Sequence, residues 1–301
     1  MFSRIGYFLY YSFSWIIWAL PLPVAYAISD FTYIILYRIA GYRRGVVRTN
    51  LTESFPEKSL NEIVEIEKKF YHHLCDLFIE SMQLLHLTNR EVKHRFRYTN
   101  PELFEELYAK NKDVIVVMGH YGNWEVNISF PLWSDYRTLA TYKPLNNPYF
   151  DKKMKEDRER FGIEAIAMKN TVKRMLELSK DPKPTLLALI ADQAPNNSET
   201  DFWVNFLNHE TGIFLGPEKI ARKINAAVLF LDIQKPKRGF YDLTAHVLCT
   251  DGKQTTDGEI TKAHVLALEK TIKHKPENWL WSHRRWKRKK PVEIPLTSLY
   301  E

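Results

Sequence analysis

A histidine and a glutamate stand five residues apart directly after an apolar run, in the stretch VIVVMGHYGNWE that covers residues 114–125. A neutral imidazole can take the proton of an attacking hydroxyl or amine, and a carboxylate at its other ring nitrogen fixes the tautomer and stabilises the imidazolium. A spacing of five does not place two side chains on one helical face. His120 and Glu125 can therefore pair only if a strand, a turn and the start of a helix lie between them.

The residues of this stretch favour that arrangement. Val114–Met118 is an uninterrupted apolar run, typical of a strand buried on both faces. Gly122 permits a tight turn, and Asn123 is a good N-cap for a helix whose first turn would hold Glu125. Ligands of open α/β sheets bind outside the carboxyl ends of the strands, where His120 would lie. From the residues alone, a catalytic His–Glu pair and a structural histidine both stay open.

Other patterns place this stretch in an α/β fold. Thr185–Ala191 and Ala227–Leu231 are further short apolar runs, and Tyr241–Leu248 alternates as an edge strand would. Helical patterns lie between the runs, at Pro148–Phe161, Val172–Ser179 and Pro217–Asn225. These features predict one α/β domain over residues 41–301, with a central mixed, mostly parallel sheet flanked by helices.

Two helix starts can be read upstream of the strands. Residues 60–85 repeat apolar side chains at three- and four-residue steps, which indicates an amphipathic helix. Ser59 and Glu62 have the spacing of a capping box at its start, and Thr88 and Glu91 repeat that spacing before a short helix.

The first forty residues form an apolar N-terminal segment. Residues 5–29 carry no charge, and a membrane-spanning helix needs about 20 apolar residues, but Pro21 and Pro23 interrupt the run. A single tilted span, two shorter helices in the bilayer interface and a buried helix of a soluble protein are the three alternatives. Arg4 precedes the segment, and several arginines follow it: Arg38, Arg43, Arg44 and Arg48. The positive-inside rule then places the bulk of the protein on the cytoplasmic side.

The composition points to an acidic partner. The chain has 43 Lys+Arg against 36 Asp+Glu, a formal net charge of +7, which favours nucleic acid, anionic lipid or an acidic carrier protein. The stretch HRRWKRKK at residues 283–290 concentrates this charge. Trp279, Trp281 and Trp286 are interleaved with it, a mixture found at membrane interfaces as well as in nucleic-acid binders. Cys75 and Cys249 form neither a disulfide framework nor a metal set, which fits a reducing compartment.

At these residues the chain resembles a known family. GHYGNWE is similar to the H-x4-D/E block of the lysophospholipid-type acyltransferases and, more narrowly, of the late acyltransferases of lipid A biosynthesis. Further blocks resemble that family in the same order, from about residue 43 to residue 290: TYKPLNNPYFDKKMKEDRERFG (141–162), LLALIADQAP (186–195), GIFLGPEKIARKINAAV (212–228) and PENWLWSHRRWKRK (276–289). The resemblance implies a glycerolipid acyltransferase-like fold behind a membrane-associated N-terminal segment, residues 1–40.

The resemblance also implies roles for single residues. His120 would be the general base and Glu125 its orienting partner. Arg158 or Arg160 would stabilise the oxyanion, because a guanidinium is always charged and offers a fork of donors. The remaining candidates for substrate binding are Asp192 and Gln193, expected to line the site, Asn123, for which a helix cap is the alternative, and Lys143, which stands where the family often has arginine.

The implied reaction moves an acyl group from an acyl carrier protein thioester, or from acyl-CoA, to a hydroxyl of a lipid A precursor at the cytoplasmic face of the inner membrane. The implied partners are the acyl carrier protein, the lipid acceptor and an anionic membrane surface, without nucleic acid. No metal or redox cofactor is implied. A lysophospholipid, aminolipid or glycolipid acceptor, and a non-enzymatic basic protein of the membrane surface, are the alternatives.

Overall fold

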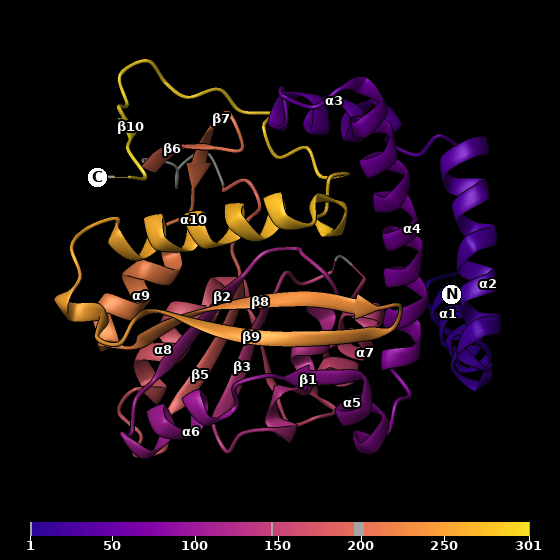
Figure 1. Ribbon diagram of the computed structural model, residues 1–301. Helices are drawn as coiled ribbons and strands as arrows, with labels where there is room; N and C mark the ends of the chain where they lie inside the picture. Colours follow the sequence, from indigo (N-terminus) through magenta and orange to yellow (C-terminus); the bar gives the residue numbers. More distant parts are fainter. Residues whose placement is uncertain (1, 146, 196–201, 301) are drawn as a thin grey trace.

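A seven-stranded sheet forms the centre of the molecule. The computed structural model describes residues 2–145, 147–195 and 202–300. The strands lie in the order β1 (Phe96–Tyr98), β9 (Phe240–Cys249), β8 (Ala227–Lys237), β2 (Val114–Met118), β5 (Thr185–Ile190), β3 (Arg137–Tyr142) and β4 (Glu164–Ala167) (Figure 1). The five strands from β8 to β4 run parallel, while β9 is antiparallel to β8. The predicted mixed, mostly parallel sheet is thereby confirmed.

One strand prediction is wrong. The alternating stretch 241–248 lies in β9, but β9 is not at the edge of the sheet, because β1 pairs with its outer side. β1 has only three residues and gives no apolar run that sequence reasoning could detect. The alternation instead reflects the burial pattern of β9, in which buried and half-buried residues alternate from Phe240 to Ala245.

Helices cover both faces of the sheet. Ile115 and Val117 of β2 join one buried cluster with side chains of α8 (Thr171–Leu178), α9 (Gly216–Ile224) and α10 (Glu259–His274). Val114, Val116 and Met118 point the other way, into a cluster with α5 (Asn89–Arg95), α6 (Glu102–Ala109) and η2 (Trp124–Leu132). All five residues of β2 are therefore buried, as an apolar run without alternation predicts.

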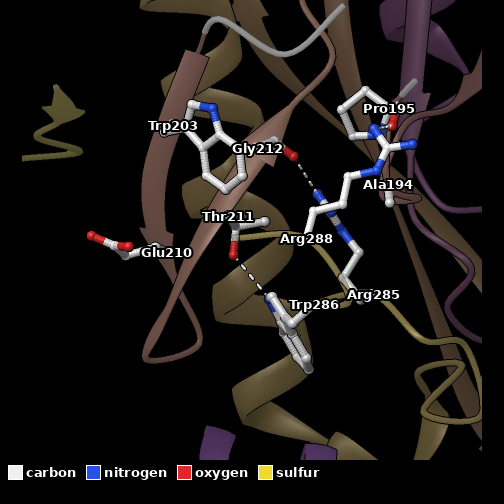
Figure 2. Close-up of a pocket in the computed structure, with 9 residues that line it drawn as sticks. All are labelled: Ala194, Pro195, Trp203, Glu210, Thr211, Gly212, Arg285, Trp286 and Arg288. Carbon is white, nitrogen blue, oxygen red and sulfur yellow. Dashed lines mark hydrogen bonds between the residues drawn. The ribbon is translucent and has the colours of Figure 1, made fainter. Parts of the chain in front are cut away.

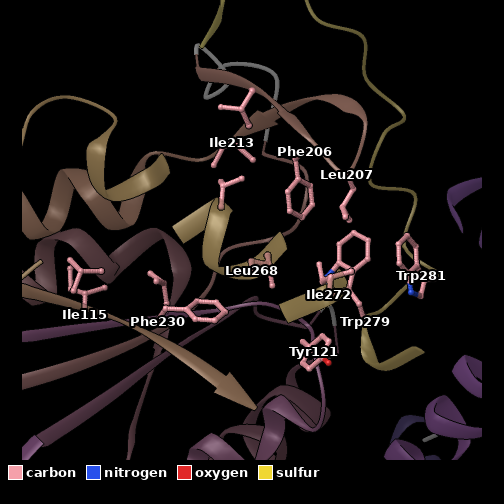
Figure 3. Close-up of a cluster of buried hydrophobic side chains, with 14 of the residues drawn as sticks. Ile115, Tyr121, Phe206, Leu207, Ile213, Phe230, Leu268, Ile272, Trp279 and Trp281 are labelled. Atoms are coloured by element: carbon pink, nitrogen blue, oxygen red, sulfur yellow. The ribbon is translucent and has the colours of Figure 1, made fainter. Parts of the chain in front are cut away.

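A second, three-stranded sheet lies beyond α10 and consists of β6 (Phe202–Phe206), β7 (His209–Ile213) and β10 (Leu296–Thr297). Phe206 and Ile213 face Leu268 and Ile272 of α10, and Trp279 and Trp281 pack beside them (Figure 3). Both tryptophans are buried, so these two belong to the core and not to a membrane or nucleic-acid interface.

The long helix α4 (Leu60–Leu84) joins the N-terminal segment to the sheet. It starts at Ser59 with the predicted capping box, and Thr88 caps α5 in the same way. The prolines divide the N-terminal segment into α1 (Phe2–Ala19) and α2 (Leu22–Tyr33), which continues as η1 (Ile34–Ile39). α1 and α2 pack on α4, with α3 (Arg44–Ser54) and α7 (Pro148–Glu159) nearby (Figure 1). In the described part of the chain, no helix has the length and apolar character needed to cross a bilayer.

Candidate active site

The register of two neighbouring strands brings His120 and Asp192 together. Met118, the last residue of β2, lies opposite Ile190, the last residue of β5. Two residues further along each chain stand His120 and Asp192, both at the carboxyl edge of the sheet. The Nδ1 atom of His120 and the Oδ1 atom of Asp192 are 2.6 Å apart. The two groups form a hydrogen-bonded imidazole–carboxylate pair.

Two further donors fix the Asp192 carboxylate. The backbone N–H of His120 and the indole N–H of Trp279 both donate to Oδ2, at 2.8 and 2.7 Å. Gly119 leaves room for this contact, because a Cβ atom there would lie 3.1 Å from Oδ2 and only 2.7 Å from a methyl group of Leu268. With Oδ2 occupied, Oδ1 remains for the imidazole, and a carboxylate at Nδ1 favours the tautomer whose proton is on Nδ1. The lone pair on Nε2 is then free to accept a proton.

Charge and burial act in opposite directions on this pair. Burial disfavours the charged imidazolium, but the negative charge and the hydrogen bond of Asp192 outweigh burial, so the pKa of His120 is raised above its ordinary value, and the charge of Glu125 adds to the rise. Burial also disfavours the charged carboxylate, yet His120 and the surrounding donors hold the pKa of Asp192 well below its usual range. Asp192 therefore stays ionised, and His120 is a stronger base than a buried imidazole without a partner.

Glu125 does not occupy the position at His120 Nδ1 that its spacing suggested. Its Oε1 atom accepts a hydrogen bond of 3.2 Å from the indole of Trp124 and lies 3.8 Å from Nη2 of Arg158. Trp124 in turn meets the ring of His120 edge to face, with centroids 5.0 Å apart. Asp192, which follows β5, occupies the place at Nδ1 of His120 that the sequence suggested for Glu125. Glu125 instead touches Trp124, and Trp124 touches the imidazole.

The two candidate arginines separate in the structure. Arg158 faces Glu125 and stays beside the site. Arg160 donates from both terminal nitrogens, at 2.7 Å each, to the backbone carbonyls of Leu84 and Leu87 at the end of α4. This guanidinium caps a helix, where cations are favoured, so the expectation of an oxyanion role for Arg160 is not supported.

Asn123 stands at the N-cap position of η2, but its buried side chain is engaged elsewhere. The residue is 1 % exposed, its side chain makes no cap hydrogen bond at η2, and its Nδ2 donates to Oε2 of Glu80 at 3.0 Å. The same buried carboxylate accepts hydrogen bonds from Tyr26 of α2 at 2.9 Å and Tyr241 of β9 at 2.6 Å. Asn123 therefore ties the turn after His120 to α2, α4 and β9.

Gln193 and Lys143 lie at the same edge of the sheet. Nε2 of Gln193 is 3.1 Å from Nε2 of His120, so its amide can donate to the lone pair that an incoming hydroxyl would use. Lys143 follows β3, the neighbour of β5, and is exposed. The structure thus gathers His120, Asp192 and Gln193 within hydrogen-bond distance and leaves Lys143 on the rim.

Sequence reasoning missed a clamp that holds the turn carrying His120. Residues 276–281 hold the turn through two backbone hydrogen bonds: the N–H of Leu280 donates to the carbonyl of His120, and the N–H of Gly122 donates to the carbonyl of Asn278. Together they form an isolated antiparallel bridge between Tyr121 and Trp279. Gly122 has a φ of 60°, and a Cβ there would lie 2.7 Å from the carbonyl oxygen of Ile233. The tryptophan-rich block near the C-terminus was the available signal for this clamp, but nothing in its residues says what it touches.

Comparison with known proteins relates the chain to one family over nearly its entire length. The profile of bacterial lipid A biosynthesis acyltransferases matches residues 1–288. The lipid A biosynthesis lauroyltransferase of Escherichia coli is 23% identical over 286 residues, which cover 93% of this chain and 90% of that protein. The lipid A biosynthesis palmitoleoyltransferase of Escherichia coli is 22% identical over 262 residues, covering 84% of this chain and 82% of that protein. The lipid A biosynthesis acyltransferase of Shigella flexneri shows the same identity and coverage.

Proposed function

The chain belongs to the bacterial lipid A biosynthesis acyltransferase family, and from this premise we propose that it moves a fatty acyl chain from a carrier thioester to a hydroxyl of a lipid A precursor, with His120 as the general base. The observation that carries this mechanism is the hydrogen bond from His120 Nδ1 to Asp192 at the carboxyl edge of the sheet. The bond leaves Nε2 as the proton acceptor.

The reaction needs one proton transfer in each direction. The acceptor hydroxyl displaces the amide of Gln193 from Nε2 and gives its proton to His120 as its oxygen attacks the thioester carbonyl carbon. Asp192 stabilises the imidazolium that forms. When the tetrahedral intermediate collapses, the C–S bond breaks and the imidazolium returns the proton to the leaving thiolate. Neither a serine nor a cysteine nucleophile takes part.

The developing negative charge on the carbonyl oxygen needs a donor. Arg158 is our candidate, because it lies beside Glu125, is only about a quarter exposed and offers a planar fork of N–H donors. Glu125 then has two tasks: it orients Arg158 and it holds Trp124 against the imidazole. Lys143 on the rim supplies positive charge toward a phosphorylated substrate.

The donor in this proposal is an acyl carrier protein thioester, with acyl-CoA as the alternative. The net charge of +7 suits an acidic carrier protein, and it suits the phosphate groups of acyl-CoA as well. Proton transfer by His120 and charge stabilisation by Arg158 suffice for acyl transfer between oxygen and sulfur, so we propose a reaction without a metal or redox cofactor.

The N-terminal helices offer a surface for the membrane on which the lipid substrate resides. Phe8, Phe31 and Ile39 are 62, 63 and 76% exposed. Further exposed large apolar side chains lie on the same helices, at Leu9, Phe13, Trp15, Ile16, Val24, Ile34 and Ile35. We call these residues the N-terminal apolar face. An amphipathic helix with such a face binds in the plane of the bilayer interface. We propose attachment at the cytoplasmic face of the inner membrane.

Charges on the N-terminal apolar face are expected to release the protein from membranes. Replacing Phe8, Phe31 and Ile39 with Asp removes three large side chains, each worth about 1.5–3 kcal/mol when fully buried in an apolar phase. Sedimentation with vesicles of phosphatidylcholine and phosphatidylglycerol should show at least tenfold weaker binding.

The matched control for this experiment is Val247→Asp, which changes an exposed apolar residue of β9 outside the N-terminal helices. Equal loss of vesicle binding in the control, or undiminished binding of the triple variant, would contradict attachment through the N-terminal apolar face.

Mass spectrometry of lipid A and polar lipids, from cells with and without the gene, tests the acceptor. We expect lipid A to lose one acyl chain without the gene and to regain it with the wild-type gene. If lipid A is unchanged while another acylated lipid disappears, the acceptor is wrong and the acyl-transfer chemistry stands. If no lipid changes, transfer by the purified protein to a lipid A precursor decides the matter, and its absence there refutes the proposal.

A further inference from the structure

The basic stretch His283–Lys290 is fixed beside the catalytic residues and is not a free tail. Asn50 donates to the backbone carbonyls of Trp281 and His283, at 2.8 and 3.0 Å. Arg285 donates to the carbonyl of Gly212 at 2.8 Å, and the indole of Trp286 donates to Thr211 at 2.9 Å. We call this stretch the basic strap. Its backbone and its buried side chains are held by α3 and β7, so the stretch has a fixed path along the molecule.

The strap reaches the loop that carries Asp192. The guanidinium of Arg288 donates to the carbonyl of Pro195, three residues after Asp192. Burial lowers the pKa of His283, and the charges of Asp192 and His120 also act on it, which places this residue within electrostatic range of the catalytic pair. The strap therefore borders the site from the side of β5 and the second sheet.

Among the described residues, the cations of the strap form no ion pair with a carboxylate. Arg284, Lys287 and Lys289 are exposed, Arg288 and Lys290 are half-buried, and Arg285 is buried. Across residues 2–145, 147–195 and 202–300, no carboxylate lies within 4.0 Å of a charged nitrogen of these six side chains. Elsewhere on the surface such pairs are frequent, for instance the three lysine–glutamate pairs along α7. Within the described parts of the chain, the strap thus gathers six cations that form no ion pair, next to the site.

Arg285 is the most unusual of these cations. It is 4% exposed, and no described group partners its Nε atom. Burial lowers its pKa to about 10; the negative charge of Asp192 opposes this fall, and the positive charge of Arg288 adds to it. A buried guanidinium that keeps an unused N–H donor and forms no ion pair with a described carboxylate favours the approach of an anion. Arg285 and Arg288 line one pocket, with Thr211, Trp203 and Trp286 around them, while Glu210 at the same pocket points its carboxylate away from both arginines (Figure 2).

The size of this pocket decides where an anion can sit. Its enclosed part measures about 10 Å³, room for roughly one water molecule. A phosphate group is larger, so it must sit at the mouth of the pocket, on the half-buried guanidinium of Arg288. Arg285 lies behind and contributes charge through the low-dielectric interior.

We propose that the basic strap is a phosphate-binding site that positions a phosphorylated substrate beside His120, with Arg288 as the contact residue and Arg285 as its buried support. This inference rests on the proposed function for the identity of the substrate, not for the chemistry of the site. A guanidinium fork matches phosphate geometry with two parallel hydrogen bonds. The phosphate belongs either to the lipid acceptor or to the phosphopantetheine arm of the donor, and the two sources are separable by kinetics.

The binding test uses the full-length protein and pyrophosphate as the probe, at constant ionic strength adjusted with sodium chloride. An anion that binds only the folded state raises Tm, by about 2–4 °C at tenfold excess over Kd for a chain of this size. We expect this rise in the wild type and in Lys110→Gln, which removes one exposed lysine between α6 and β2, at the opposite edge of the sheet. We expect Arg288→Gln to lose it and Arg288→Lys to keep part of it.

The kinetic test assigns the phosphate to its source. If the lipid acceptor carries it, Arg288→Gln raises KM for the acceptor about tenfold, leaves kcat within twofold and has no effect on KM for an acceptor stripped of phosphate by a phosphatase. If the donor carries it, KM for the acyl carrier thioester rises instead. Either outcome supports the site.

Two results would overturn the proposal that the basic strap binds phosphate. One is a pyrophosphate-dependent Tm that is the same in the wild type and in Arg288→Gln. The other is a change of KM no larger than that caused by Lys110→Gln, which would mean general surface charge. A wild-type protein that binds pyrophosphate through Arg288 but acylates no lipid A precursor would refute the proposed function and leave the phosphate site standing.

Discussion

Alanine at position 120 is expected to lower kcat for acyl transfer by about 10²- to 10⁴-fold, the range that a positioned general base contributes. The loss should appear in kcat, because the imidazole contacts the attacking hydroxyl most strongly in the transition state. Folding should survive, since the ring of His120 makes its hydrogen bonds with Asp192 and Gln193 at the sheet edge and not within the core.

The measurement is steady-state transfer from an acyl carrier thioester to a lipid A precursor, with circular dichroism to verify the fold. His246→Ala is the matched control, because His246 is an exposed histidine of β9. We expect its kcat to equal that of the wild type. Transfer by a folded His120→Ala variant at more than a tenth of the wild-type rate would remove His120 from the mechanism.

Asp192→Asn is expected to lower kcat nearly as much as His120→Ala, by about 10²- to 10⁴-fold, without changing the shape of the site. The amide oxygen can still accept from the backbone of His120 and from Trp279, which leaves the NH₂ group facing Nδ1. An N–H donor at that position requires Nδ1 to be the acceptor, so the ring proton moves to Nε2. The atom that should take the substrate proton is then already protonated.

The acid limb of the pH profile of kcat/KM should also shift in a defined direction. In the wild type Asp192 raises the pKa of His120, so kcat/KM falls as the pH drops through that raised value and the base becomes protonated. Without the negative charge only burial and the weaker influence of Glu125 remain, and burial lowers the pKa. The acid limb of the profile for Asp192→Asn should therefore shift to lower pH, with a much lower plateau.

Glu125→Gln is the comparison that separates the two carboxylates. Glu125 acts on His120 through charge and through Trp124, not through a hydrogen bond to the ring. We expect a loss of about tenfold or less for Glu125→Gln and a smaller shift of the acid limb. A larger loss for Glu125→Gln than for Asp192→Asn would show that the spacing of five, and not the strand register, identifies the orienting carboxylate.

Local patterns in the sequence determined the elements of this protein. Val114–Met118 is a strand because an apolar run of this length can be stable only between two layers of helices, and the structure begins and ends β2 at the predicted residues. The capping boxes at Ser59 and Thr88 start α4 and α5, because the side chains that satisfy the first N–H groups of each helix lie within three residues of them. The turn and the helix after Met118 also followed from such short-range rules. So did the position of His120 at the carboxyl edge of the sheet, where ligands bind.

Only the tertiary structure decided which groups meet at that edge. Asp192 follows His120 by 72 residues and reaches Nδ1 because β2 and β5 pair in a parallel register that no local pattern encodes. Trp279 arrives from still further along the chain, and Glu80 holds Asn123 from a helix on the other side of the turn. Glu125 is close to His120 in the sequence, but its carboxylate contacts Trp124 and Arg158. Arg160 lies in a stretch that resembles the family, but its guanidinium binds backbone carbonyls at the end of α4. Spacing along the chain limits where a side chain can go, whereas strand register and helix packing select among the remaining places.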